Sequence, residues 1–146
     1  MSNREQAAGS VRANLCNATI TAAISSVVQG SVQGIPGAKS LHMQANFTYG
    51  SGGTSADAYV QTSLDGGATW FDIANFHFLL VSAKKLSVVV IDPATPFTAG
   101  TTPGSGTLTA NTVLTGILGD RVRVLLVTTG TYAGGTTLAV DVVAKG

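Results

Sequence analysis

Apolar and polar residues alternate along much of this chain. Between residues 39 and 49, every odd position from Leu41 onward is apolar and every even position is polar. A period of two is typical of a β-strand that buries one face in a core and leaves the other face in solvent. This segment therefore predicts a half-buried strand with His42 on its exposed face.

Similar patterns predict further strands, separated by stretches rich in glycine and proline. The segment 18–28 is expected to be a strand, although its alanine content also allows a helix. Loops are expected at 30–37 and 94–106. Lys84 and Lys85 are expected to form a short turn or to guard the edge of a sheet. The other strands are predicted at 57–64, 69–81, 86–91, 107–118, 121–128 and 136–144.

The apolar positions change phase within the predicted strand 69–81. Phe71 and Ile73 occupy odd positions, whereas Phe76 and Phe78 occupy even ones. One extra residue in a strand resets its alternation, so both sets can face a core if a β-bulge or bend lies near 74–75. A strand buried on both faces is the alternative explanation.

About eight short strands at this spacing predict an all-β fold. We expect a single-domain antiparallel β-sandwich that spans 17–146. A jelly-roll-like arrangement is preferred, and an immunoglobulin-like arrangement is the alternative. Residues 1–16 are polar and show no clear period, so they are expected to form an N-terminal arm that is flexible or docked on a partner.

The chain is poor in charge for its length. Of its 146 residues, 45% are hydrophobic and only 10% are charged, whereas about a quarter is usual. Low charge predicts a surface covered by other subunits, and so a homo-oligomer. A net charge of +1 gives no electrostatic argument for binding nucleic acid or an anionic membrane. No stretch resembles a signal peptide or a transmembrane segment, so synthesis in the cytoplasm is expected.

Residues 63–70, Ser-Leu-Asp-Gly-Gly-Ala-Thr-Trp, form the strongest local motif. Asp-Gly-Gly between two strands predicts a tight hairpin turn, because such turns need residues that tolerate positive φ. The pattern resembles the Asp-box hairpin of sialidases, although those families carry several copies. The resemblance implies a structural turn that polar side chains hold together, with the aromatic residue packing the hairpin onto the core. The matching residues are Ser63, Asp65, Gly67, Thr69 and Trp70.

Few residues carry candidate catalytic or metal-binding chemistry. Cys16 is the only cysteine, and it falls in the predicted arm without a base nearby. His42 and His77 lack metal-ligand spacing and are expected to be structural. Asp65 and Asp72 could face each other as a glycosidase pair does, or Asp65 could join a calcium site, but Asp65 is better explained as a turn residue. None of these patterns predicts a catalytic residue, a metal or a cofactor.

Aromatic residues suggest a second class of function. Exposed faces of Trp70, Tyr59 and Tyr132 would suit a carbohydrate-binding module, in which aromatic rings stack on sugars. The competing interpretation, which the hairpin motif favours, is that Trp70 packs onto the core.

Two stretches, 59–74 and 119–124, together with the Gly- and Thr-rich hairpin that follows to residue 146, give the chain a wider resemblance. The chain is similar there to small β-sandwich structural proteins of tailed bacteriophages. The resemblance implies a virion component without catalytic residues, preferably a capsid cement (decoration) protein that forms a homotrimer and binds the major capsid protein. A head–tail junction or tail component is the alternative within the virion.

Overall fold

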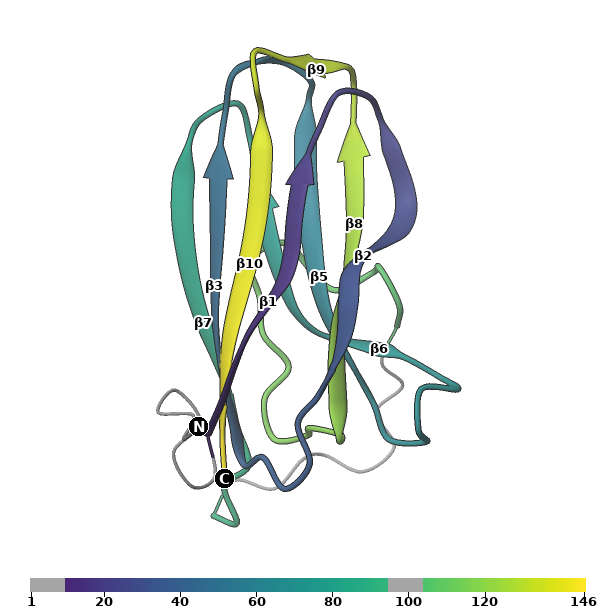
Figure 1. Ribbon diagram of the computed structural model, residues 1–146, viewed down its shortest axis with the longest axis vertical. Helices are drawn as coiled ribbons and strands as arrows, with labels where there is room; N and C mark the ends of the chain where they lie inside the picture. The colour runs from purple at the N-terminus through teal and green to yellow at the C-terminus, as the bar shows by residue number, and fades with distance from the viewer. Residues whose placement is uncertain (1–9, 95–103) are drawn as a thin grey trace, which may run out of the picture.

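Strands form most of the described part of the chain, which comprises residues 10–94 and 104–146 of this computed structural model (Figure 1). No helix occurs in these two ranges. The strands are β1 (Ser10–Thr19), β2 (Ile24–Gly34), β3 (Ser40–Thr48), β4 (Ser51–Gly52), β5 (Ser55–Ser63), β6 (Phe71–Phe78), β7 (Ala83–Val90), β8 (Arg121–Thr129), β9 (Tyr132–Ala133) and β10 (Thr137–Lys145).

The eight longer strands form two four-stranded antiparallel sheets packed face to face, while β4 and β9 form a small pair at one end (Figure 1). We call β1-β10-β3-β7 the first sheet and β2-β8-β5-β6 the second sheet. Strands pair inward from the two ends of the chain: β1 with β10, β2 with β8, β3 with β7, and β5 with β6. This is one long hairpin rolled into a sandwich, which defines a jelly roll. The predicted β-sandwich and the preferred jelly-roll arrangement are both confirmed.

The core lies between the two sheets and follows the period of two. In β3, Leu41, Met43, Ala45 and Phe47 are buried and the residues between them are not, as predicted. Phe47 stacks on Phe78 of the second sheet with 5.0 Å between ring centroids. Burying a side chain of this size contributes roughly 1.5–3 kcal/mol, so these contacts bind the two sheets together.

The N-terminal strand begins earlier than predicted. Residues 10–16, assigned to the arm, belong to β1 and pair with β10. A register shift between Asn14 and Cys16 makes Leu15 and Cys16 consecutive buried residues. This irregularity conceals the alternation in the sequence, which explains the error. The remainder of the predicted arm lies outside the described residues.

The predicted strand 18–28 is divided between β1 and β2 in the structure. The chain leaves β1 at Thr19, and β2 starts at Ile24 and runs to Gly34 through most of the predicted loop 30–37. The β2 register shifts twice, between Ile24 and Val27 and between Gln29 and Gln33. An edge strand with two irregularities loses the simple period that identifies a strand.

The phase slip predicted in β6 is present one residue before the expected position. Val60 of β5 pairs with Ala74 and the next residue, Gln61, pairs with Asp72. Ile73 is therefore the extra residue of a β-bulge. The bulge allows Phe71 and Phe76 to face the same core, and it turns Asp72 to the outer face of the second sheet.

Two predicted elements near β7 differ in the structure. Residues 84–85 do not form a turn, because they lie inside β7. Since β7 is an edge strand of the first sheet, their position fits the alternative of an edge guard. Residues 107–118 contain no strand, and only Val113 forms an isolated bridge, with Ala74 of β6. The Leu114 amide donates to the Ile73 carbonyl (2.8 Å), and the Gly116 amide donates to the Val90 carbonyl (3.1 Å). The segment thus forms hydrogen bonds with the edges of both β6 and β7 instead of continuing one sheet. Such bonds leave no alternation of apolar and polar residues in the sequence.

On the opposite side of the sandwich, β2 approaches β1 at Gly30. This residue has φ of +66°, and a Cβ added to it would lie 1.9 Å from the Leu15 carbonyl oxygen. Only glycine permits both the left-handed backbone and the close approach. Gly37 has a similar φ of +74° but has open space around a Cβ.

Alanine substitutions at these two glycines distinguish the cost of a steric clash from the cost of backbone strain. We expect Gly37→Ala to cost about 1–2 kcal/mol of unfolding free energy from the left-handed backbone alone. Gly30→Ala should cost about 3 kcal/mol or more, because the Leu15 carbonyl must also move. Urea unfolding of both variants measures the difference. Equal losses would contradict the close packing of β1 on β2.

Candidate functional site

The turn between β5 and β6 contains the five residues of the predicted hairpin motif. The Ser63 hydroxyl donates to Asp65 Oδ1 and accepts from the Gly67 amide, both at 2.8 Å. The Thr69 amide donates to Asp65 Oδ1 at 2.8 Å, and the Thr69 hydroxyl donates to Asp65 Oδ2. These bonds favour the charged carboxylate and lower the pKa of Asp65 to about 2, with the Thr69 hydroxyl as the main cause.

Trp70 closes the same turn and is half-buried. Its indole Nε1 donates to the Gly67 carbonyl at 3.0 Å. The guanidinium of Arg123 lies 4.3 Å from the centre of its ring, in a cation–π contact. Arg121 Nη1 donates to the Gly66 carbonyl at 2.8 Å. The two arginines of β8 therefore support the turn and one face of the tryptophan.

A second cluster, around Asp72, fastens the covering segment, which we define as residues 104–118. Asp72 is only 1% exposed. Its Oδ1 accepts from the Gly106 amide (2.9 Å), and its Oδ2 accepts from the Thr107 and Leu108 amides (2.8 and 3.0 Å). Gln61 Nε2 adds a fourth bond at 2.9 Å. The carboxylate is thus a structural acceptor, with a partner set separate from that of Asp65.

The third cluster joins β5, β6 and β7. His77 Nδ1 lies 2.8 Å from Asp57 Oδ1, so His77 bonds a neighbour on the outer face, as predicted. Lys85 Nζ donates to Asn111 Oδ1 at 3.0 Å and to the His77 carbonyl. Lys85 crosses from β7 to β6 and contributes to closing this side of the sandwich.

Cys16 lies in the core of the sandwich rather than in an arm. It is fully buried, and burial raises the pKa of its thiol to about 11. A buried thiol of high pKa is a poor nucleophile, so the structure gives Cys16 a packing role.

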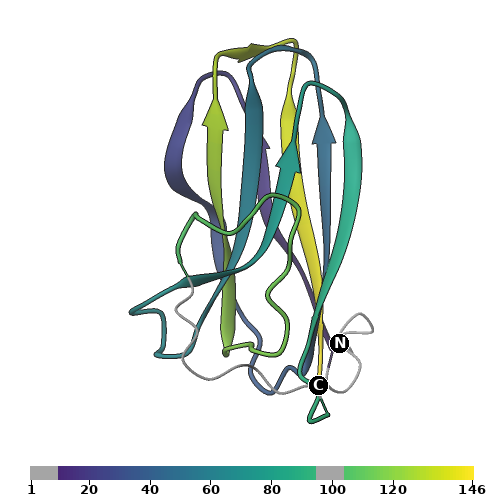
Figure 2. The ribbon, with the colours of Figure 1, turned by 180° about the vertical axis from the view of Figure 1, so that it is seen from behind.

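The two sheets differ in what covers their outer faces. The covering segment crosses in front of the second sheet, as the green trace in Figure 2 shows. Beneath it Tyr59 and Leu125, both on that outer face, are 9% and 6% exposed. On the first sheet, the corresponding positions of β3 remain exposed or half-exposed. Among the described residues, the outer face of the first sheet is therefore the open face.

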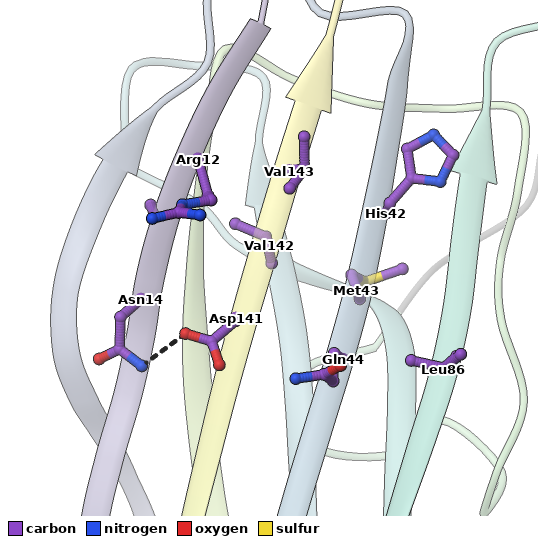
Figure 3. A pocket seen from close by; sticks show the side chains of 10 residues that line it. Arg12, Asn14, His42, Met43, Gln44, Leu86, Asp141, Val142 and Val143 are labelled. Atoms are coloured by element: carbon purple, nitrogen blue, oxygen red, sulfur yellow. Dashed lines mark hydrogen bonds between the residues drawn. The ribbon is translucent and has the colours of Figure 1, made fainter. Parts of the chain in front are cut away.

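A shallow groove of about 620 Å³ runs across this open face (Figure 3). Two rows of side chains cross all four strands in register. One row is Arg12, Val143, His42 and Val88, and the other is Asn14, Asp141, Gln44 and Leu86. Asn14 Nδ2 donates to Asp141 Oδ1 at 2.9 Å, as the dashed line in Figure 3 marks.

The groove has the chemistry of a recognition surface. Arg12 supplies a cation and Asp141 an anion, while Gln44 and His42 both donate and accept hydrogen bonds. Leu86, at one margin of the groove, is 73% exposed and adds an apolar contact. These groups suit a flat partner with mixed polar groups, and we take the open face as the candidate functional site.

The sequence predicted only part of this site. The alternation in 39–49 placed His42 and Gln44 on an exposed face, and both are there. Arg12 and Asn14 were missed because β1 was not recognised as a strand. The alternation of 136–144 indicated that Asp141 points away from the core, but only the strand order places it beside Asn14.

Comparisons of the chain with protein-family models, curated proteins and solved structures found no match. Within residues 10–94 and 104–146, no three His, Cys, Asp or Glu side chains come together as a metal site would require. In the same ranges, no helix is long and apolar enough to cross a membrane.

The lowered pKa of Asp65 predicts a pH-dependent contribution to stability. A carboxyl with a depressed folded-state pKa stabilises the fold above its unfolded pKa, about 4, and the contribution is lost as pH falls towards 2. Asp65→Asn should therefore lower the melting temperature at pH 7 and lower it less at pH 2. Thermal unfolding of both proteins between pH 7 and pH 2 measures this. A difference in melting temperature between the two proteins that stays constant from pH 7 to pH 2 would show that ionised Asp65 does not stabilise the turn.

Removing the charge of Asp72 should weaken the covering segment. In Asp72→Asn, the side-chain amide would face backbone amides that also donate, which leaves buried donors without acceptors. We expect a loss of about 2–4 kcal/mol in urea unfolding and faster hydrogen exchange at residues 106–108. Asp92→Asn, at an exposed carboxylate, is the control and should change little. If the amides of residues 106–108 exchange as slowly in Asp72→Asn as in the wild type, the Asp72 carboxylate does not fasten the covering segment.

Proposed function

We propose that this chain is a non-enzymatic structural component of a tailed-bacteriophage virion, a cement (decoration) protein that binds and stabilises the major capsid shell as a homo-oligomer. The resemblance of residues 59–74 and 119–124 to phage sandwich proteins suggests the class. The three polar clusters support a non-enzymatic role, because Asp65, Asp72 and His77 are all engaged in contacts that hold the fold together.

The observation that carries the proposal is the amount of apolar side chain left in solvent. Covering a half-exposed Leu or Val contributes roughly 1 kcal/mol, so together these side chains represent on the order of 10 kcal/mol. That is comparable with the free-energy cost of protein association. A low-charge domain with such a surface is suited to assembly. The exposed large apolar residues in the described ranges are Val27, Val28, Val32, Leu64, Leu79, Leu80, Val81, Leu86, Val88, Val90 and Val113.

The open face of the first sheet is the surface we assign to the capsid. It is broad, crossed by two in-register rows, and mixes Arg12 and Asp141 with neutral hydrogen-bonding groups. Rigid strands hold these groups in position, so little order has to be created on binding. The second sheet cannot present an equivalent surface where the covering segment lies on it.

A carbohydrate-binding role has less support. Tyr59 and Tyr132 are 9% and 2% exposed, and Arg123 occupies one face of Trp70. These three residues therefore do not form a solvent-facing row of aromatic rings.

Co-sedimentation with capsids tests the proposal. Capsids assembled from the major capsid protein of the same genome are mixed with the purified chain. We expect binding by the wild type and at least about 10-fold weaker binding by Gln44→Arg, at the centre of the open face. Thr109→Arg adds the same charge to the covering segment and should bind like the wild type.

Two results would contradict the proposal at different points. If the wild type does not bind capsids, the capsid role is wrong. If Gln44→Arg and Thr109→Arg both bind normally, the chain is a cement protein but the open face is not its docking surface.

A further inference from the structure

Four connections between strands meet at one end of the sandwich, the upper end in Figures 1 and 2. They are 20–23 between β1 and β2, 49–54 between β3 and β5, 79–82 between β6 and β7, and 130–136 between β8 and β10. None of these described residues is Asp, Glu, Lys, Arg or His. The connections at the opposite end do carry charges, among them Lys39, Asp65 and Asp120. We call the four connections the uncharged end.

Three consecutive apolar side chains are exposed at the uncharged end. Leu79, Leu80 and Val81 are 59%, 48% and 62% exposed. They directly follow Phe78, which is buried in the core. A single exposed leucine is ordinary in a folded protein, but contiguous exposed apolar residues mark a contact site. We call residues 79–81 the apolar tip.

Hydrogen bonds connect the apolar tip to the rest of the uncharged end. The Tyr49 amide donates to the Ser82 hydroxyl at 2.8 Å, and the Tyr49 hydroxyl donates to the Gly52 carbonyl at 2.9 Å. The Gly50 amide donates to Thr136 Oγ1 at 2.9 Å. These bonds join three of the four connections. The tip therefore belongs to a preformed surface, and little order has to be created on binding.

The exposed charge next to the apolar tip is positive. Lys84 is exposed and follows Val81 by three residues, or about 10 Å of extended chain. The acidic residue nearest to the tip along the strands is Asp57, which pairs with His77 at 2.8 Å. Lys85 donates to the His77 carbonyl. A partner that reaches past the tip thus meets the ammonium group of Lys84.

We propose that the uncharged end binds an anionic lipid surface, with the apolar tip inserted among the headgroups and Lys84 against lipid phosphates. A charged side chain is costly to move into a bilayer, and the four connections contain none. Apolar insertion combined with a cation is how peripheral proteins attach to anionic membranes. This activity goes beyond the capsid role and uses the end of the sandwich instead of its open face.

A lipid surface fits this pattern better than a protein partner does. A protein can supply opposite charges, so a protein contact does not require all four connections to be uncharged. The serine, threonine and backbone groups around the tip can form hydrogen bonds with headgroups and interfacial water. The net charge of +1 conceals the pattern, because the charged residues lie outside the uncharged end.

Vesicle flotation of the purified chain tests the proposal. Vesicles of phosphatidylcholine alone are compared with vesicles that also contain phosphatidylglycerol. Leu80→Asp places a charge in the apolar tip, and Lys84→Gln removes the cation. Leu64→Asp is the matched control, because Leu64 is 60% exposed in the β5–β6 turn at the opposite end. All three variants replace exposed residues, and circular dichroism verifies that each is folded.

We expect the wild type and Leu64→Asp to bind equally, and more tightly to the vesicles that contain phosphatidylglycerol. Leu80→Asp should bind both kinds of vesicle at least about 10-fold more weakly, because a carboxylate resists insertion. Lys84→Gln should bind the anionic vesicles about 5-fold more weakly and leave binding to phosphatidylcholine unchanged.

Tryptophan fluorescence provides a direct measure of insertion. The single native tryptophan, Trp70, lies at the opposite end, so its emission should not change when vesicles are added to the wild type. In Leu80→Trp, the added indole should shift its emission to shorter wavelength. A shift in the wild type, or none in Leu80→Trp, would contradict insertion of the apolar tip.

The flotation results separate this proposal from the capsid role. A wild type that binds neither kind of vesicle overturns the lipid proposal and leaves the capsid role standing. Vesicle binding that Leu80→Asp retains in full overturns the assignment to the apolar tip. If vesicles are not bound and Leu80→Asp loses capsid binding, the tip contacts protein and the lipid proposal is wrong. Vesicle binding by a chain that does not bind capsids would leave only the lipid proposal.

Discussion

The β-bulge at Ile73 is the constraint on which much of this structure depends. Without it, Asp72 would have the same parity as Ala74 and would point into the apolar core, where a carboxylate without partners is very costly. With it, Ile73 and Ala74 both stay buried and Asp72 emerges on the outer face beside Gln61. There the carboxylate accepts hydrogen bonds from three backbone amides near the start of the covering segment. One inserted residue thus reconciles a continuous core with an outer polar anchor.

The anchored segment makes the sandwich asymmetric. It covers part of the second sheet and bridges the β6 and β7 edges by hydrogen bonds, beside the contact of Lys85 with the His77 carbonyl and Asn111. The first sheet keeps its outer face free. The distribution of polar groups follows from this difference. Those under the segment bond one another, whereas on the open face only Asn14 and Asp141 form a side-chain pair within residues 10–94 and 104–146. The same bonds that stabilise the fold therefore decide which face can recognise another molecule.

The sequence predicted the regular parts of the fold and missed the irregular ones, for a physical reason. Where a strand is regular, as in β3 and β10, side-chain parity and burial coincide and the alternation can be read directly. The bulge in β6 was predicted because large apolar residues stand on both sides of it. The irregularity in β1 was not, because Leu15 and Cys16 follow polar residues that suggested an arm. The open-face groove could be predicted only in part, since Asn14 and Asp141 are 127 positions apart and meet through strand order alone.

Edge strands connect this asymmetry to assembly. A jelly roll leaves four edges, and this chain protects them unequally. The covering segment bonds the β6 edge and one end of β7, and the β1 and β2 edges approach each other at Leu15 and Gly30. Strand β2 contains no charged residue and exposes three valines, whereas β7 carries Lys84 in the same exposed row as Leu86 and Val88. Lysine on an edge strand discourages pairing with another chain, so β2 is the less protected of these two edges. The outward side chains of β7 belong to the open face, because Leu86 and Val88 stand in register with Gln44 and His42. That face therefore combines apolar contacts with its charges and hydrogen-bonding groups.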